Sequence, residues 1–177
     1  METINARTFF SLIWPNPLYE DETLELRAIR RADKEVKREF LPSISEFLKA
    51  TKNYGTGWDI YFGISTRYLT GGTKADCYRI SCTWVDFDNT VKLPDFKKTP
   101  PSIVVNSGGG FHAYWVLETP VFLRSGDWKE IEAVNRALSK RFSGDKNCID
   151  ITRILRVPGS YNYKYDPPRK VVASEYS

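Results

Sequence analysis

The stretch Cys77-Tyr78-Arg79-Ile80-Ser81-Cys82-Thr83-Trp84-Val85-Asp86-Phe87-Asp88 is the part of the chain that decides its fold. Its β-branched and aromatic residues predict a core strand that ends in two carboxylates. Since successive side chains of a strand point to opposite faces, Asp86 and Asp88 share one face, roughly 7 Å apart, and Phe87 points to the other. Like charges this close favour a cation between them, and oxygen ligands suit Mg²⁺ or Mn²⁺. The alternative is that Asp88 only opens a turn.

A second polar stretch, Ser107-Gly108-Gly109-Gly110-Phe111-His112, connects two apolar runs over 102–106 and 111–117. This pattern predicts a β-hairpin with a glycine turn. Backbone N–H groups of glycine can approach a ligand closely and form a nest for phosphate. The turn and the histidine beyond it are therefore a candidate phosphate site, although a flexible turn and a structural histidine would show the same pattern.

A third stretch combines a carboxylate with basic and amide side chains, namely Asp150, Arg153, Arg156, Asn162 and Lys164. The apolar residues over 149–157 predict a strand, and a Pro-Gly turn follows them. The planar fork of arginine and the point charge of lysine suit a triphosphate. Ordinary surface pairing with acids is the alternative for each basic residue.

The remaining elements predict an α+β fold with a mainly antiparallel sheet. Apolar residues at every fourth position predict an amphipathic helix over 20–40, whose basic face either contacts nucleic acid or only faces water. A short strand and an irregular lead-in are expected over 1–19. The Ser43 to Glu46 spacing predicts the start of a second helix, alternation predicts a strand over 58–65, and a third helix is expected from Asp127 to Gly144.

Composition places the chain among folded globular proteins. Its 177 residues suffice for one substantial domain, and 41% of them are hydrophobic. No apolar run approaches the ~20 residues of a membrane span and no signal pattern opens the chain, so we expect a cytoplasmic protein without a membrane partner. The net charge of +4 is compatible with a polyanionic partner but does not establish one.

Cysteine and histidine counts exclude several kinds of site. The three cysteines, an odd number without a Cys-x-x-Cys pair, argue against a disulfide framework and a zinc ribbon. The single histidine excludes mechanisms that need two, including the two-histidine metal sites of rolling-circle nickases.

Taken together and in this order, the motifs Trp84–Asp88, Asn106–Trp115 and Asp150–Lys164 resemble those of the archaeo-eukaryotic primase (AEP) superfamily. The closest type is the primase-polymerase (PrimPol) of plasmid, phage and CRISPR-associated replication proteins, and the match covers about residues 58–165. The resemblance implies an AEP catalytic core, with an RRM-like sheet packed against a smaller N-terminal α/β module. We expect a single core over 1–177, with an N-terminal part over 1–56 and an RRM-like catalytic part over 57–177, which could be a piece of a longer protein.

The resemblance also implies roles for individual residues. Asp86, Asp88 and Asp150 correspond to catalytic metal ligands, and the nucleotide-binding positions correspond to Ser107, Gly109, His112, Arg156, Asn162 and Lys164. Asp145 is the alternative third acid. We favour Asp150 because its isoleucine neighbours predict that it lies on a strand in the same sheet as Asp86.

The implied activity is that of a DNA-directed nucleotidyltransferase. It would use two Mg²⁺ or Mn²⁺ ions to extend primers on a single-stranded DNA template or a primer-template, and the initiation of primers is a second expectation. Nucleoside triphosphates are the expected substrates, and a helicase or an accessory priming domain are the expected additional domains. Since no cysteine cluster supplies the zinc module that many relatives use for priming, extension is the safer expectation.

Two other functions remain open at this stage. A non-catalytic RRM-like nucleic-acid-binding domain would use the many aromatic residues to stack bases, but it would not need three acids on one face. An Asp-x-Asp glycosyltransferase for nucleotide sugars would need a parallel sheet with more crossover helices than the chain predicts.

Overall fold

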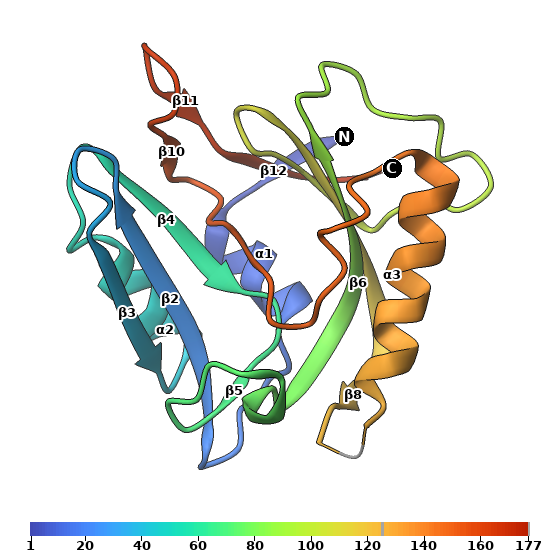
Figure 1. Cartoon of the computed structure of the whole chain (residues 1–177), viewed down its shortest axis with the longest axis horizontal. Helices are drawn as coiled ribbons and strands as arrows, with labels where there is room; N and C mark the ends of the chain where they lie inside the picture. The colour runs from blue at the N-terminus through green and yellow to red at the C-terminus, as the bar shows by residue number, and fades with distance from the viewer. Residues whose placement is uncertain (125, 177) are drawn as a thin grey trace.

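The computed structural model describes residues 1–124 and 126–176, and these form two larger antiparallel sheets, a two-stranded hairpin and three α-helices (Figure 1). The first sheet has the order β1 (Glu2–Ile4), β12 (Val172–Glu175), β7 (Ile103–Asn106), β8 (Gly110–Phe122) and β6 (Arg79–Asp88). The second has the order β3 (Val36–Leu41), β2 (Glu22–Arg30), β4 (Trp58–Gly63) and β9 (Ile154–Arg156), with β5 (Arg67–Tyr68) on β2. The prediction of an α+β fold with mainly antiparallel sheets is confirmed.

The helices lie between and outside the sheets. In Figure 1, α1 (Ala6–Ile13) lies between the two sheets and α3 (Trp128–Phe142) covers the outer side of β6, while α2 (Ile44–Thr51) packs on β2 and β3. A 3₁₀ turn over Lys74–Asp76 precedes β6, and a small hairpin pairs β10 (Tyr161–Asn162) with β11 (Arg169–Lys170). No helix in the described part of the chain is long and apolar enough to cross a bilayer.

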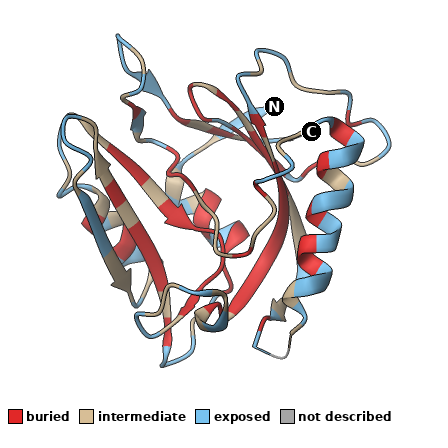
Figure 2. Cartoon of the chain, in the orientation of Figure 1, coloured by how far each residue is buried: buried red, intermediate tan, exposed pale blue. Residues whose placement is uncertain are grey.

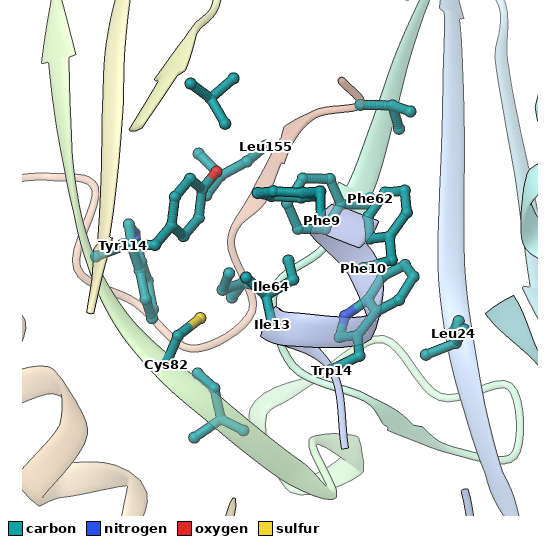
Figure 3. Packing of buried hydrophobic residues seen from close by; sticks show 14 of the residues in the cluster. Phe9, Phe10, Ile13, Trp14, Leu24, Phe62, Ile64, Cys82, Tyr114 and Leu155 are labelled. Carbon is teal, nitrogen blue, oxygen red and sulfur yellow. The ribbon is translucent and has the colours of Figure 1, made fainter. Parts of the chain in front are cut away.

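The main core lies between the sheets, around α1. Figure 3 shows it continuing from Phe62 of the second sheet through Phe9 and Phe10 to Tyr114 of the first sheet. The Phe9 ring lies edge-on to the rings of Phe62 and Tyr114, with ring centres 5.6 Å and 5.4 Å apart, respectively. Figure 2 shows the buried residues concentrated along α1, β2, β4 and β6. Burial of each large apolar side chain contributes about 1.5–3 kcal/mol to the stability of the folded state, so this core holds the two sheets against each other.

Strand β6 has the predicted alternation. Cys82 and Trp84 point into the main core, and Asp86 continues the same face. Val85 and Phe87 point the other way, into a smaller cluster that includes residues of α3. The apolar part of β6 therefore anchors the strand between two cores, and its carboxylate end is the part that remains for chemistry.

The predicted helix over 20–40 is wrong, because this segment forms the β2–β3 hairpin. Leu24, Leu26 and Ala28 are all fully buried, which is the two-residue period of a strand. A spacing of four residues fits both one helical turn and two strand pleats, so Leu24 and Ala28 alone did not distinguish the two. The hairpin turns at Lys34, whose φ of 64° ends any regular helix.

The predicted strand over 149–157 is correct only at its end. Asp150 lies in a turn, in which Arg153 N donates to the Asp150 carbonyl at 2.9 Å and Thr152 N donates to the Asp150 carboxylate at 2.8 Å. Such local hydrogen bonds compete with strand pairing. Only β9 is extended, and it pairs with β4 of the second sheet rather than with β6. The placement of Asp150 on a strand beside Asp86 is therefore wrong.

The other predicted elements can be compared directly. The strand near the N-terminus, the helix after Ser43, the β7–β8 hairpin and the helix after Asp127 are confirmed. Ser43 caps α2 by accepting a hydrogen bond from Glu46 N at 3.2 Å. The expected irregular lead-in is wrong over Ala6–Ile13, because Asn5 caps α1 by accepting from Thr8 N at 3.0 Å.

Candidate functional site

A cavity of about 200 Å³ lies between the carboxylate end of β6 and the β4–β9 pair of the second sheet. It brings together every predicted site residue except Asp150, namely Asp86, Asp88, Ser107, Gly109, His112, Arg156, Asn162 and Lys164. Residues that we did not predict also line it, among them Tyr61, Asn89 and Tyr165. Three stretches far apart in the sequence therefore contribute to one cavity.

Two carboxylates, Asp86 and Asp88, line the acidic side of the cavity, and a third, Asp145, lies close to them. Asp86, Asp88 and Asp145 each offer an oxygen within 4.8 Å of the other two. Burial raises the pKa of Asp86; the nearby His112 lowers it, and the charges of Asp88 and Asp145 raise it further. Carboxylates gathered in this way repel one another unless a cation neutralises them. This is the donor set that hard divalent ions prefer.

The end of α3 delivers Asp145 to this cluster. Ser143 ends the helix in the left-handed region, with φ of 59°. Gly144 then passes so close to β6 that a Cβ would lie 2.1 Å from a methyl carbon of Val85 and 3.0 Å from the Asp86 carbonyl. Asp145 N donates to that Asp86 carbonyl at 2.8 Å. The loop is thus tied to the strand that carries the other two acids.

Asp150 has different partners. Its carboxylate lies 2.9 Å from the Lys74 ammonium and accepts hydrogen bonds from Thr152. Burial opposes ionisation, but the hydrogen bonds from Thr152 and Lys74 leave the pKa of Asp150 below its usual value. Lys74 also pairs with Glu132 of α3 at 2.6 Å. The geometry therefore favours Asp145, which we held as the alternative, as the third acid.

His112 lies directly opposite Asp86 in the β6–β8 ladder. Its Nε2 is 3.7 Å from an Asp86 carboxylate oxygen, and its Nδ1 is 3.2 Å from the Tyr114 hydroxyl. Burial lowers the pKa of His112; Asp86 raises it and Arg156 lowers it. An imidazole with a lowered pKa is neutral near pH 7, which suits a hydrogen-bonding ligand more than a permanent positive charge.

The glycine turn and the third stretch are joined by hydrogen bonds. Ser107 Oγ donates to the Gly110 carbonyl at 3.1 Å, and Asn162 Nδ2 donates to the Ser107 carbonyl at 2.9 Å. Gly110 has no room for a side chain, since a Cβ would lie 2.0 Å from the Phe87 carbonyl. The turn is therefore held close to β6 on one side and to Asn162 on the other.

A buried carboxylate that we did not predict positions the basic side of the cavity. Asp59 accepts a hydrogen bond from Arg156 at 2.7 Å and from Tyr163 N at 2.9 Å, and it forms an ion pair with Arg31. The Arg156 guanidinium lies 4.9 Å from the centre of the Tyr61 ring. The signal was present in the sequence, because a carboxylate inside an apolar strand must have a charged or hydrogen-bonding partner.

Comparison of the chain with known proteins identifies its family. The family model described as RepB DNA-primase N-terminal domain matches residues 82–171. A replication protein of Clostridium perfringens is 31% identical over 97 residues, which are 55% of this chain and 22% of that protein. Protein RepS of Streptococcus pyogenes is 26% identical over 133 residues, which cover 65% of this chain and 26% of RepS. The chain thus spans about a quarter of the length of these curated relatives.

Solved structures share the fold. The AEP domain of the cyanophage S-2L primase-polymerase superposes with a TM-score of 0.62 at 19% identity, over 88% of this chain and 82% of that one. The catalytic domain of primase RepB′ in complex with initiator DNA superposes with a TM-score of 0.62 at 18% identity, over 88% of this chain and 77% of that one. These likenesses confirm the predicted resemblance to AEP primase-polymerases at the level of the fold. Since the family model covers half of its residues, the chain belongs to the RepB DNA-primase N-terminal domain family.

Proposed function

We propose that the chain is the catalytic core of a replication primase that transfers nucleotides onto a primer paired with a single-stranded DNA template. One observation supports this most directly. Across a single cavity, the carboxylates of β6 face Arg156, Asn162 and Lys164 of the second sheet and its following hairpin. This is the arrangement that phosphoryl transfer needs, with a cation-binding side and a triphosphate-binding side.

Asp86, Asp88 and Asp145 are the residues that would hold Mg²⁺ or Mn²⁺, two ions in the proposed reaction. Their oxygens are close enough to share ions, and no lysine or arginine within 1–124 or 126–176 forms an ion pair with any of them. The cluster is therefore an uncompensated negative charge, which fits a bound cation. When bound, the ions supply activation of the primer 3′-hydroxyl and stabilisation of the departing pyrophosphate.

The remaining residues would bind and orient the nucleotide. Arg156 is fixed by Asp59 and offers its remaining N–H groups to a phosphate, and the exposed Lys164 side chain has no ion-pair partner in the described residues. His112 and the backbone of the turn at Ser107 and Gly109 line the same wall. Little proton transfer is asked of these groups, since positioning and charge stabilisation carry most of the catalysis.

The proposed organisation is a single catalytic core over 1–177, with its parts at 1–56 and 57–177. The second sheet contains strands from both parts, because β2 of the first part pairs with β4 of the second. We further propose that additional domains of the full-length protein, such as a helicase or an accessory priming domain, supply the steps that precede extension.

Primer extension with Mg²⁺ or Mn²⁺ tests the proposal. Asp86→Asn and Asp88→Asn should each lose more than about 100-fold in rate, because a lost ligand costs more than a lost outer-shell partner. Their melting temperatures should be unchanged or higher, since repulsion is relieved. Asp95→Asn, which changes an exposed acid paired with Lys97, is the control and should extend normally. Full activity of both site variants, or no extension by the wild type with either metal, would refute the proposal and leave a non-catalytic binder.

A further inference from the structure

A second groove, outside the catalytic cavity, is lined by aromatic side chains. It has a volume of about 690 Å³ and lies where the start of α1 and the end of α2 meet β4 and the segment 157–163. Four aromatic residues line it, Tyr54, Trp58, Tyr161 and Tyr163. Tyr54 and Trp58 lie 5.3 Å apart, and Tyr161 and Tyr163 lie 6.3 Å apart, measured between ring centres. The groove therefore has an aromatic pair on each of two chain segments.

Hydrogen bonds fix the ring of Tyr54 and the backbone of Tyr163. The Tyr54 hydroxyl donates to Glu39 at 2.6 Å, and the backbone N–H of Tyr163 donates to the buried Asp59 at 2.9 Å. Tyr161 remains 44% exposed. An exposed aromatic ring on a fixed backbone is costly to hydrate and inexpensive to stack against, because little side-chain entropy remains to be lost.

The groove is charged as a polyanion would require. Arg7 of α1 and Lys52 at the end of α2 line it, and both are exposed. Neither forms an ion pair with any residue in 1–124 or 126–176. Aromatic platforms combined with free cations are the recurring pattern of surfaces that bind single-stranded nucleic acid.

The groove shares a wall with the catalytic cavity. In the segment from Tyr161 to Lys164, Asn162 and Lys164 line the cavity, while Tyr161 and Tyr163 line the groove. Tyr161 and Asn162 point to opposite faces because the backbone of β10 is extended, and Tyr163 and Lys164 lie in the turn that follows; β10 itself lies beside β4 (Figure 1). A DNA strand lying in the groove would therefore be separated from the proposed nucleotide site by the segment 161–164 alone.

We propose that this groove binds the bases of single-stranded DNA, by stacking on Tyr161 and Tyr163, and that Arg7 and Lys52 contact its phosphates. The inference rests on the proposed function, because it assigns a place to the template strand. Duplex DNA is not expected to bind in the same way, because its bases are stacked on one another already.

Fluorescence anisotropy with a labelled single-stranded oligonucleotide, without metal or nucleotide, tests this groove in the full chain. Tyr161→Ala should weaken binding at least about fivefold, the lower end of what one base stack contributes, and Tyr161→Phe should bind like the wild type because it keeps the ring. An oligonucleotide with abasic positions should not distinguish Tyr161→Ala from the wild type. Arg7→Ala should reduce the salt dependence of binding by about one unit of slope, which Tyr161→Ala should leave unchanged.

Tyr19→Ala is the matched control, because this exposed tyrosine lies beside Arg79 and Tyr78 and not in the groove. The proposal would be overturned if the Tyr161→Ala, Tyr163→Ala double variant bound DNA as tightly as the wild type. It would also be overturned if Tyr161→Phe lost as much DNA affinity as Tyr161→Ala. The two proposals fail separately. Active Asp86 and Asp88 variants would refute the catalytic proposal, whereas inactive aspartate variants together with unchanged DNA affinity in the tyrosine variants would refute only the groove.

Discussion

The Lys74 ammonium lies 2.9 Å from the Asp150 carboxylate, so Asp150 already has a cationic partner, whereas Asp145 forms no ion pair among the described residues. Lys74 is placed between Asp150 and Glu132 by the 3₁₀ turn that precedes β6. This ion pair, formed between segments that are distant in the sequence, separates the two candidate third acids.

We predict that Asp145→Asn abolishes primer extension and that Asp150→Asn retains it. The first change removes one of three clustered carboxylates without altering its shape. The second removes a half-exposed ion pair, whose loss costs about 1 kcal/mol or less. Extension assays and thermal melts of both variants are the measurements. An active Asp145→Asn protein together with a folded but inactive Asp150→Asn protein would show that the metal site includes the turn at Asp150.

Arg156→Ala should weaken nucleoside triphosphate binding about 10- to 100-fold, which corresponds to one charge-assisted hydrogen bond. DNA affinity should change much less, because Arg156 lines the cavity and not the groove. His112→Ala should show the same preference for the nucleotide. Titrations of labelled nucleotide and labelled DNA can be compared with Arg136→Ala, an exposed arginine of α3 that should affect neither. Equal losses for both ligands would place Arg156 at the DNA instead.

Glu25→Gln should destabilise the fold by about 3–5 kcal/mol, because it leaves the fully buried Arg67 without its counter-ion. The Glu25 carboxylate is fully buried and lies 2.8 Å from the fully buried Arg67 and 2.9 Å from Arg38. Chemical denaturation at neutral pH measures the loss. Glu118→Gln, an exposed change on β8, is the control and should leave stability within about 0.5 kcal/mol.

The same carboxylate gives a pH dependence with a defined sign. Burial raises the pKa of Glu25, but Arg67, Arg38 and Arg27 together hold it below the usual 4.5. A lowered folded-state pKa means that the stabilisation is fully present above about pH 4.5 and is lost as the pH falls through the folded value. Denaturation curves between pH 3 and pH 7 should therefore be flatter for Glu25→Gln than for the wild type. If both proteins lost stability equally steeply as the pH fell, groups other than Glu25 would be responsible for the pH dependence.

Gly144→Ala should lower stability by about 1–3 kcal/mol, the usual cost of inserting a methyl group into a packed site. Its Cβ would lie 2.1 Å from Val85, so either the loop or β6 must move. Gly55→Ala is the matched control, since nothing lies within 4 Å of its Cβ position, and it should be neutral or slightly stabilising. Thermal melts of both variants decide the matter, and similar melting temperatures would contradict the close approach.

The parts of the fold that were predictable are those in which local pattern and nearby pairing agree. The β7–β8 hairpin needs only a glycine turn between two apolar runs, and β6 shows its two faces along its own sequence. The β2–β3 hairpin was mistaken for a helix because Leu24 and Ala28 fit both periods, and only the burial of Leu26 against β4 distinguishes them. The two-residue alternation of Leu24, Leu26 and Ala28 was present in the sequence, but the four-residue spacing also fitted a helix, and packing against β4 decided between the two.

The acidic pair and the basic third stretch were recognisable for the same local reasons, but the way they meet was not. Asp145 occurs in a polar loop whose sequence predicts only a turn, and its Oδ1 does accept a turn hydrogen bond from Asn147 N at 2.8 Å. What brings it to Asp86 is the end of α3 packing on β6, which depends on residues far along the chain. The role of Asp59 likewise depends on its hydrogen bond with Arg156, which is distant in the sequence.

The order of strands in the first sheet also constrains how the protein is made. Among the described residues, strand β1 pairs with β12 alone, with Glu2 opposite Glu175, and β12 pairs in turn with β7. Such contacts of maximal sequence separation form late, because the intervening loop must be closed first. During synthesis the first strand therefore leaves the ribosome long before its partner exists. The β6–β8 pairing, which contains Asp86 and Asp88, and the β2–β4 pairing, which contains Tyr61, can form while translation continues, and the edge of the first sheet closes last.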